Sequence, residues 1–365
     1  MQYMPAQATL VLMVIVFALV LAPFIIMIVS RVLKKHHLAE KLSQRNGDSV
    51  HYAFIINPSK PQAEQYRKTI EEYCEENNLP YEIIDTQLDK DGRECALEAL
   101  DHGANVVVAV GGDGTVRTVA SAVSGKDHAM GIIPIGTGNL FARNMGIPMN
   151  DVHAALKVAT SHGSRKVDVG RVALLDSVNK DHAHAFLIIS GIGFDALMID
   201  DTNPHLKKNI SWLAYFVAGA KHLFMPKYRA NIILKRTDGS EYKTNGVNFR
   251  TFMAGNCGQI PMFSLMPNAS YDDGVLDFEI IDTTGGIIGW ANVFGDVLHQ
   301  TFTGKAQQSP LSTNSKIDQY QGLWAQVQLE KAAPVQVDGD ILGYTKLLRF
   351  TVEKQALCVR VPESK

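Results

Sequence analysis

The chain has 365 residues and a mass of 40.1 kDa, which corresponds to about two domains and one additional segment. Hydrophobic residues make up 46% and charged residues 20%, so the composition excludes an intrinsically disordered or collagen-like chain. The 35 basic and 37 acidic residues give a formal charge of -2, so we expect no nucleic-acid partner. The four cysteines are scattered without a CxxC motif, which argues against a disulfide framework or a zinc site.

A long uncharged run lies near the start of the chain, at residues 9–30. A helix of this length reaches about 33 Å, enough to cross a hydrocarbon core of about 30 Å. Basic residues follow the run from Arg31 and none precedes it, so the positive-inside rule places the following chain in the cytoplasm. The alternatives are a cleaved signal peptide, which would need a basic start and a small-residue cleavage site, and a buried soluble helix, which would carry a polar face. We predict a single-pass transmembrane helix at 9–30 in the plasma (cytoplasmic) membrane and a juxtamembrane linker at 31–50.

The next part of the chain alternates between strand-like and helix-like patterns. We expect strands at 52–56, 81–84, 105–110 and 131–135, and helices at 62–78, 91–102 and 116–123. The run NVVVAV at 105–110 is continuously apolar, which is typical of a strand buried on both faces. This alternation predicts a doubly wound parallel α/β domain over residues 51–168.

After residue 169 the pattern changes to short β-rich runs separated by turn residues. The expected strands are at 185–190, 230–234, 247–254, 275–281 and 325–329. They predict a second, mainly antiparallel β-rich domain over 169–349, interrupted by helices at 207–224 and 287–302, with residues 350–365 returning to the first domain. The expected fold class is therefore α/β plus mainly β, behind an N-terminal transmembrane helix. The mixture of basic and aromatic residues at 207–229 fits either a helix that buries its aromatic side chains or one that faces lipid.

Two glycine-rich turns follow neighbouring strands of the predicted parallel sheet, GGDGT at 111–115 and GTGN at 136–139. Glycines let backbone N–H groups approach a ligand, and the following helix N-terminus attracts an anion. One such turn could be an ordinary strand-to-helix connection, but two would converge at the carboxyl edge of the sheet, where ligands bind. Asp113 adds a carboxylate there that is able to hold Mg²⁺. Neither turn is a Walker A loop, and GIGFDA at 191–196 lacks the following helix that a dinucleotide-binding motif needs.

Further motifs occur in a characteristic order, from Asn57-Pro58 through the two glycine-rich turns. They continue with Asp168-Val169-Gly170, GIGFDA, SYDDGVLD at 270–277 and VDGD at 337–340. The ordered set resembles the catalytic domain shared by diacylglycerol kinases, sphingosine kinases and soluble bacterial lipid kinases, over roughly residues 51–363. GGDGT alone also resembles NAD kinases and phosphofructokinases, whereas the whole set is specific.

The resemblance implies roles for individual residues. It implies that ATP is bound by Asn57, Thr86, Gly112, Asp113, Gly114, Thr115, Gly136, Thr137, Gly138 and Asn139. It implies a structural Mg²⁺ site at Ser270, Asp273 and Val275, with Ser270 and Val275 contributing backbone oxygens. It also implies that Asp340 is the general base, with Asp113 as the second catalytic residue through Mg²⁺.

Three positions depart from the family pattern. The first turn, usually NPxSG, reads Asn57-Pro58-Ser59-Lys60-Pro61 here, so its glycine is missing and Lys60 is a candidate counter-charge for phosphate instead. Leu140 replaces an aspartate found in many members, and Asp340 replaces the commoner glutamate, which shortens the reach to the acceptor. We predict an ATP- and Mg²⁺-dependent lipid kinase whose favoured acceptor is diacylglycerol. The alternatives are a kinase for a sphingoid base, another glycerolipid or NAD, and a non-catalytic nucleotide-binding regulator at the membrane.

Overall fold

In the computed structural model, residues Val50–Lys365 form one compact unit. It describes residues 50–136, 138–177, 183–193, 196, 227–257, 259–260, 263–264, 266, 269–283 and 316–363. No helix within these ranges has both the length and the apolar character that a membrane crossing requires. The predicted transmembrane helix at 9–30, the linker up to residue 49 and the predicted helices at 207–224 and 287–302 lie outside the described residues.

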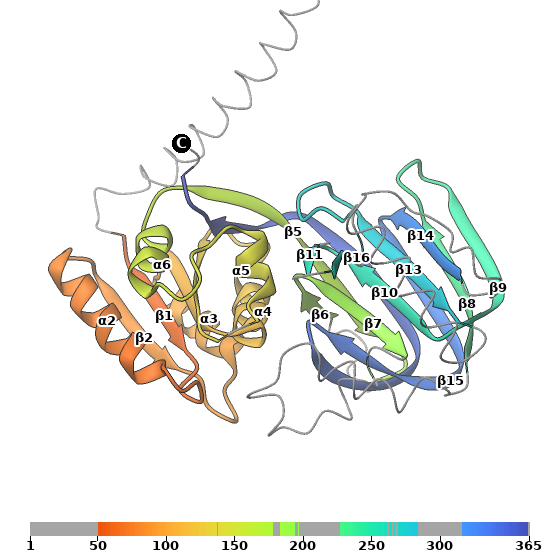
Figure 1. Ribbon diagram of the computed structural model, residues 1–365, viewed down its shortest axis with the longest axis horizontal. Helices are drawn as coiled ribbons and strands as arrows, with labels where there is room; N and C mark the ends of the chain where they lie inside the picture. The colour runs from red at the N-terminus through yellow and green to blue at the C-terminus, as the bar shows by residue number, and fades with distance from the viewer. Residues whose placement is uncertain are drawn as a thin grey trace, which may run out of the picture. The chain divides into compact units, whose positions relative to one another are not determined.

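Four parallel strands form the first part of the sheet, in the order β4-β3-β1-β2 (Figure 1). Their bounds are Tyr52–Ile56 for β1, Tyr81–Asp85 for β2, Val106–Gly111 for β3 and Ala129–Pro134 for β4. Every residue of β1, β3 and β4 is buried, so the prediction of a central strand covered on both faces is confirmed for β3. The predicted α/β character of this part of the chain is therefore confirmed.

Helices cover both faces of these strands. The bounds are Ala63–Glu76 for α2, Gly92–Asp101 for α3, Asp113–Val123 for α4, Leu140–Asn144 for α5 and Val152–Ala159 for α6. Ile70 of α2 and Leu156 of α6 pack with Phe54 of β1 on one face. Helices α3 and α4 pack with Ile55, the next residue of the same strand, on the other face. Neighbouring residues of a strand point to opposite faces, so β1 supplies both hydrophobic cores.

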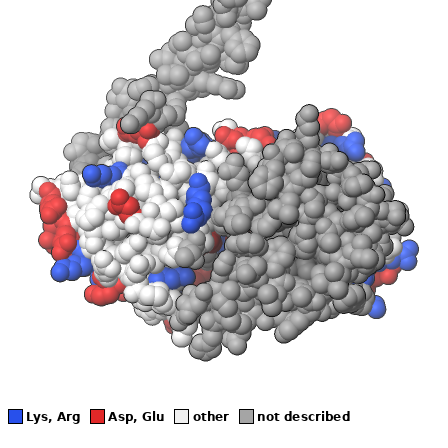
Figure 2. Space-filling view, viewed as in Figure 1, with Lys and Arg blue, Asp and Glu red and all other residues white. Residues whose placement is uncertain are grey.

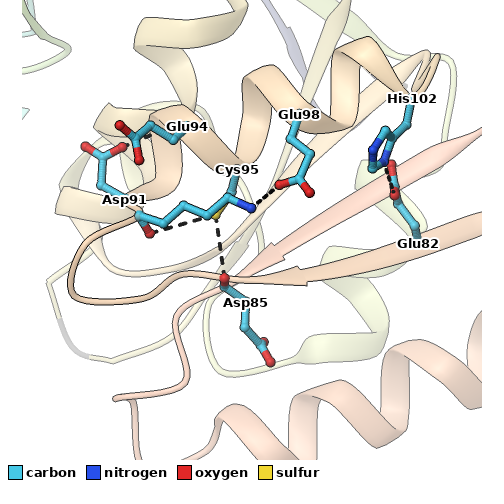
Figure 3. Close-up of polar contacts among 8 residues, drawn as sticks. Glu82, Asp85, Asp91, Glu94, Cys95, Glu98 and His102 are labelled. Carbon is cyan, nitrogen blue, oxygen red and sulfur yellow. Dashed lines mark hydrogen bonds and ion pairs between the residues drawn. The ribbon is translucent and has the colours of Figure 1, made fainter.

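The edge strand β2 is tied to α3 by polar contacts (Figure 3). Asp91 caps α3 by accepting the backbone N–H groups of Arg93 and Glu94 at 2.8 and 3.1 Å. At the other end of the helix, His102 lies 2.9 Å from the carboxylate of Glu82 on β2. These contacts hold the helix in register along the edge of the sheet.

The remaining strands of the large sheet are mainly antiparallel to their neighbours. Their bounds are Ser164–Leu174 for β5, Ala183–Phe186 for β6, Ile189–Gly193 for β7, Tyr228–Lys235 for β8, Glu241–Phe249 for β9, Thr251–Gly255 for β10, Leu276–Asp282 for β13, Lys316–Gly322 for β14, Trp324–Val337 for β15 and Asp340–Arg360 for β16. Gln259–Ile260 and Phe263–Ser264 pair separately as β11 and β12. Packed aromatic rings, including Phe252, Phe278 and Phe350, form the core of this part.

The strand β16 connects the antiparallel and parallel parts of the sheet. It pairs antiparallel with β15 and β5, and its end at Cys358 and Val359 pairs in parallel with β4. The predicted boundary between residues 168 and 169 falls inside β5. The division into two domains therefore stays a prediction, within a body that forms a single compact unit.

Two expected strands differ in the structure. The run at 185–190 is divided between β6 and β7, because the backbone turns at Leu187 and Ile188, whose N–H groups bind the Asp338 carboxylate. The run at 247–254 is divided between β9 and β10 at Arg250. Gly191 and Gly193 of the GIGFDA motif lie within β7.

Candidate functional site

The first glycine-rich turn joins β3 to α4 at the carboxyl edge of the parallel sheet. Gly112 is the N-cap of α4, and it adds no side-chain cap to the N–H groups of the first helical turn. A Cβ atom built on Gly112 would lie 3.3 Å from the Nζ atom of Lys60. The backbone donors of the helix and the ammonium group of Lys60 therefore lie close together, an arrangement that suits a phosphate group.

The Asn57-Pro58 turn, after β1, lies against the same glycine-rich turn. The Asn57 side chain donates from Nδ2 to Thr115 Oγ1 at 3.4 Å, and its Oδ1 accepts the N–H of Ser59 at 3.0 Å. Thr115 in turn packs against Gly111, where a Cβ atom would lie 2.6 Å from Oγ1. The predicted nucleotide residues of the first strand and of the GGDGT turn are therefore brought together.

Asp113 links the two glycine-rich turns. Its Oδ2 accepts the N–H of Asn139 at 2.8 Å and its Oδ1 accepts the N–H of Leu140 at 2.7 Å. Burial raises the pKa of Asp113, and these backbone donors oppose the rise. Gly138 allows this approach, because a Cβ atom there would lie 2.9 Å from Oδ2. The carboxylate thus orders the GTGN turn, and its predicted contact with Mg²⁺ stays a prediction.

The second turn is built around Asn139, which adopts a left-handed conformation with φ of 50°. Its side chain donates from Nδ2 to the carbonyl of Gly136 at 3.1 Å, while its buried Oδ1 has no hydrogen-bond partner within the described part of the chain. A buried acceptor without a donor is costly, so a ligand donor at this position would be stabilising. The predicted residue Thr137 lies outside the described residues. Leu140, where many relatives have an aspartate, donates its backbone N–H to Asp113.

Asp340 reaches this region from the other end of the chain. Residues 338 and 339 form the two-residue turn between β15 and β16, and both have positive φ, 45° and 88°. An Asp-Gly pair is favoured in such hairpin turns because both central residues must adopt positive φ. The Asp338 carboxylate anchors the turn by accepting three backbone N–H groups at 2.8 to 3.0 Å from residues 187–189.

The turn places Asp340 beside the first turn of α4. Asp340 Oδ2 lies 2.8 Å from Nη2 of Arg117 and 3.2 Å from the position of a Cβ atom on Gly114. The two predicted catalytic carboxylates therefore lie at the same end of α4. Asp113 belongs to its first turn, and Asp340 contacts Arg117 from the β15–β16 turn. Arg117 was not predicted, because no motif includes it and its partner is 223 positions away.

The predicted structural metal residues lie in a turn before β13. Ser270 Oγ donates to Asp272 at 2.7 Å, and Asp273 Oδ1 accepts the N–H of Val275 at 3.1 Å. The turn is held by the buried Asp168, whose carboxylate accepts the N–H of Gly274 at 2.6 Å. The sequence placed Asp168 in a motif without giving it a role.

The charges and possible ligands at this second site decide how well it fits a cation. Burial raises the pKa of Asp273, the backbone N–H of Val275 opposes the rise, and the nearby Asp168 and Asp272 carboxylates add to it. Across the described residues, however, no group of three or more His, Cys, Asp and Glu side chains could hold a metal ion. A cation here would depend on backbone oxygens, as predicted, and the assignment stays a prediction.

Thr86 lies at the same edge of the sheet, immediately after β2, and its N–H donates to the carbonyl of Ile56 at 2.9 Å. On the face shown in Figure 2, basic and acidic side chains lie among one another over the described residues, without a continuous patch of either charge. The local positive charge of the site thus comes from Lys60, Arg117 and the helix N-terminus rather than from a broad basic surface.

Known proteins share this sequence pattern. Residues 51–172 match the family model of the diacylglycerol kinase catalytic domain. A protein of Pseudomonas aeruginosa named "Probable lipid kinase YegS-like" is 31% identical over 277 residues, which cover 75% of this chain and 82% of that protein. A diacylglycerol kinase of Bacillus subtilis is 28% identical over 193 residues, which cover 52% of this chain and 59% of that protein.

The fold is also similar to a solved structure. The crystal structure of a diacylglycerol kinase from Bacillus anthracis superposes with a TM-score of 0.58 at 19% sequence identity, covering 86% of this chain and 97% of that chain. This similarity supports the mixed α/β fold with a large sheet.

Proposed function

The chain belongs to the lipid kinases that carry a diacylglycerol kinase catalytic domain, and on this premise we propose that it transfers the γ-phosphate of ATP to a hydroxyl group of diacylglycerol. The observation that carries the proposal is the meeting of two distant segments. Asp340, at the start of β16, lies against the N-terminal turn of α4, and Gly112, the N-cap of that helix, lies beside Lys60. A phosphate cradle and a half-exposed carboxylate are thus adjacent.

The first turn offers positively charged groups for the phosphates of ATP. The uncapped N–H groups of α4 and the ammonium of Lys60 would hold phosphate oxygens, and Asn57 and Asn139 would border the nucleotide. Mg²⁺ would arrive with those phosphates and neutralise charge that develops on them during transfer. Asp113 keeps the two turns together through its backbone hydrogen bonds.

In the proposed reaction Asp340 acts as the general base. Its free carboxylate oxygen accepts the proton of the acceptor hydroxyl as the O–H bond breaks. The hydroxyl oxygen forms a bond to the γ-phosphorus, the bond from that phosphorus to the bridging oxygen breaks, and ADP leaves with the electron pair. The products are a lipid phosphate and ADP, and the proton later passes from Asp340 to water.

The location of the reaction is part of the proposal. The uncharged run at 9–30 and the basic residues after it support a single-pass anchor with the kinase body on the cytoplasmic side of the plasma membrane. The anchor would keep the body close to lipids that cannot diffuse through water.

The test is transfer of label from γ-labelled ATP by the full-length protein in mixed micelles. Diacylglycerol, a sphingoid base, another glycerolipid and NAD are supplied in parallel, with Asp113→Ala and Asp340→Ala variants alongside the wild type. Label in diacylglycerol that both variants lose supports the proposal. Label only in another acceptor would replace the substrate, and label in none, with ATP still bound, would favour a nucleotide-binding regulator.

A further inference from the structure

Arg117 occupies a special position in the site. It lies three residues after Gly114 on α4, so both residues face the same side of the helix. Its Nη2 donates to Asp340 Oδ2 at 2.8 Å. The Arg117 side chain is only 12% exposed, whereas that of Asp340 is 50% exposed. A well-held cation therefore contacts a carboxylate that is otherwise open to water.

Two carboxylates lie near the Arg117 guanidinium, and one of them forms an ion pair with it. Asp338 is also near, and the charge of Arg117 lowers its pKa against the larger rise that burial causes, to about 6. However, the Asp338 carboxylate already accepts three backbone N–H groups. Asp340 accepts from Arg117, and a Cβ on residue 114 would crowd the same Oδ2 atom. The absence of a side chain at Gly114 thus leaves room for this ion pair.

We propose that Arg117 is a positioning residue for the transfer reaction: it holds Oδ2 of Asp340 so that Oδ1 points at the acceptor hydroxyl. This inference rests on the proposed function and adds a residue to it. A half-exposed aspartate can rotate about both side-chain torsions, and a general base must be within hydrogen-bond reach of its proton. The ion pair with Arg117 removes that freedom.

The experiment compares Arg117→Gln and Arg117→Lys with wild type in the full-length enzyme. Arg117→Gln is expected to lower kcat about 100-fold, as expected when a catalytic group is misplaced, while KM for ATP changes less than about twofold. Arg117→Lys keeps the charge and is expected to recover at least about tenfold of that loss. An unchanged kcat in Arg117→Gln, or an equal loss in Arg117→Lys, would overturn the proposal.

Arg171, in β5, provides a matched control because its side chain contacts the same helix. Its Nη2 lies 2.9 Å from Glu353, with exposures of 13% and 44%, and it also donates to Ser121 and Ser124 of α4. Arg171→Gln removes an equally buried arginine that contacts α4 from β5, without touching Asp340. It is expected to keep kcat within about twofold, and a loss as large as that of Arg117→Gln would mean that both act only through helix stability.

A double substitution separates positioning from an independent effect. If Arg117 acts through Asp340, Arg117→Gln combined with Asp340→Asn will be no slower than Asp340→Asn alone, because residues acting as a unit are not additive. A further loss of about 100-fold in the double variant would contradict the proposal. Failure of the kinase proposal is distinguishable, because then the wild type itself labels no lipid.

Discussion

Two glycines at the start of α4 border different parts of the site. Gly112 faces the ammonium of Lys60, and Gly114 faces the carboxylate of Asp340. Neither has a positive φ, so an alanine at either position meets no backbone strain. Each glycine therefore allows one close approach, Gly112 on the proposed phosphate side and Gly114 on the proposed acceptor side.

This arrangement predicts that substitutions at the two glycines change different kinetic constants. Gly112→Ala should raise KM for ATP about tenfold with little change in kcat, because the added Cβ displaces Lys60 from the phosphate space. Gly114→Ala should lower kcat about tenfold by crowding Asp340, while helix stability rises by up to about 1 kcal/mol. Steady-state kinetics and thermal unfolding of both variants check this. The same kinetic change in both would show that the two sides are not separate.

At the residue scale, contacts between near neighbours in the sequence were predictable, and contacts between distant residues were not. The glycine-rich turns and Lys60 were predictable, because their chemistry depends on neighbours within a few positions. The link from Asp113 to Asn139 spans 26 positions, and the Arg117 to Asp340 pair spans 223. An arginine on an α-helix has many ordinary roles, so only the fold distinguishes this one.

At the scale of elements, Asp338 connects the β15–β16 turn to the break between β6 and β7. Asp338→Asn keeps a residue that tolerates positive φ but replaces one acceptor oxygen with a donor that faces a backbone N–H. We expect a loss of about 2 kcal/mol in unfolding free energy at pH 8, measured in urea. Asp238→Asn, in an exposed turn between β8 and β9, should change it by less than about 0.5 kcal/mol. Equal effects would contradict an anchoring role for Asp338.

Strand β13 contains a titratable group that is almost completely buried. Burial raises the pKa of Glu279 to about 7 from an ordinary 4.5, although Gln319 donates to its Oε2 at 2.9 Å. Between these two pH values the folded protein binds more protons than the unfolded chain, so stability falls as pH rises and levels off above about 7. The carboxylate is thus expected to cost stability at neutral and alkaline pH.

Glu279→Gln removes this titration while preserving shape. The variant should gain up to about 3 kcal/mol over the wild type at pH 8, an upper limit from the pKa shift, and little at pH 4.5. Unfolding in urea across this pH range measures it. A variant that loses stability equally at both pH values would show that Glu279 acts through hydrogen bonding rather than through its charge.

Element bounds were predictable where local periodicity determines them. β1 has its expected bounds, and α2 and α3 begin and end within two residues of expectation. The run at 185–190 was not predictable as two strands, because the carboxylate that turns its backbone at Leu187 is 151 positions away. An uninterrupted apolar run contains no signal for such a contact.

For the whole molecule, the proposed anchor can be separated from the body. Residues 50–365 form one compact unit, so a chain starting at Val50 should fold and keep lipid kinase activity in mixed micelles. We expect it to move from the membrane fraction to the soluble fraction, because it lacks the run at 9–30. Fractionation of cells expressing both forms measures this. Retention of the shortened chain in the membrane would show that the body binds lipid by itself.

The pairing of β16 has a consequence for the order of events during synthesis. The proposed general base is residue 340, and the partner strand for the outer edge of β4 comes at residues 358 and 359. A growing chain can assemble β1 to β4 early, but β4 then presents unpaired backbone groups until the last strand emerges. The glycine-rich turns proposed to bind ATP are therefore synthesised long before the proposed general base.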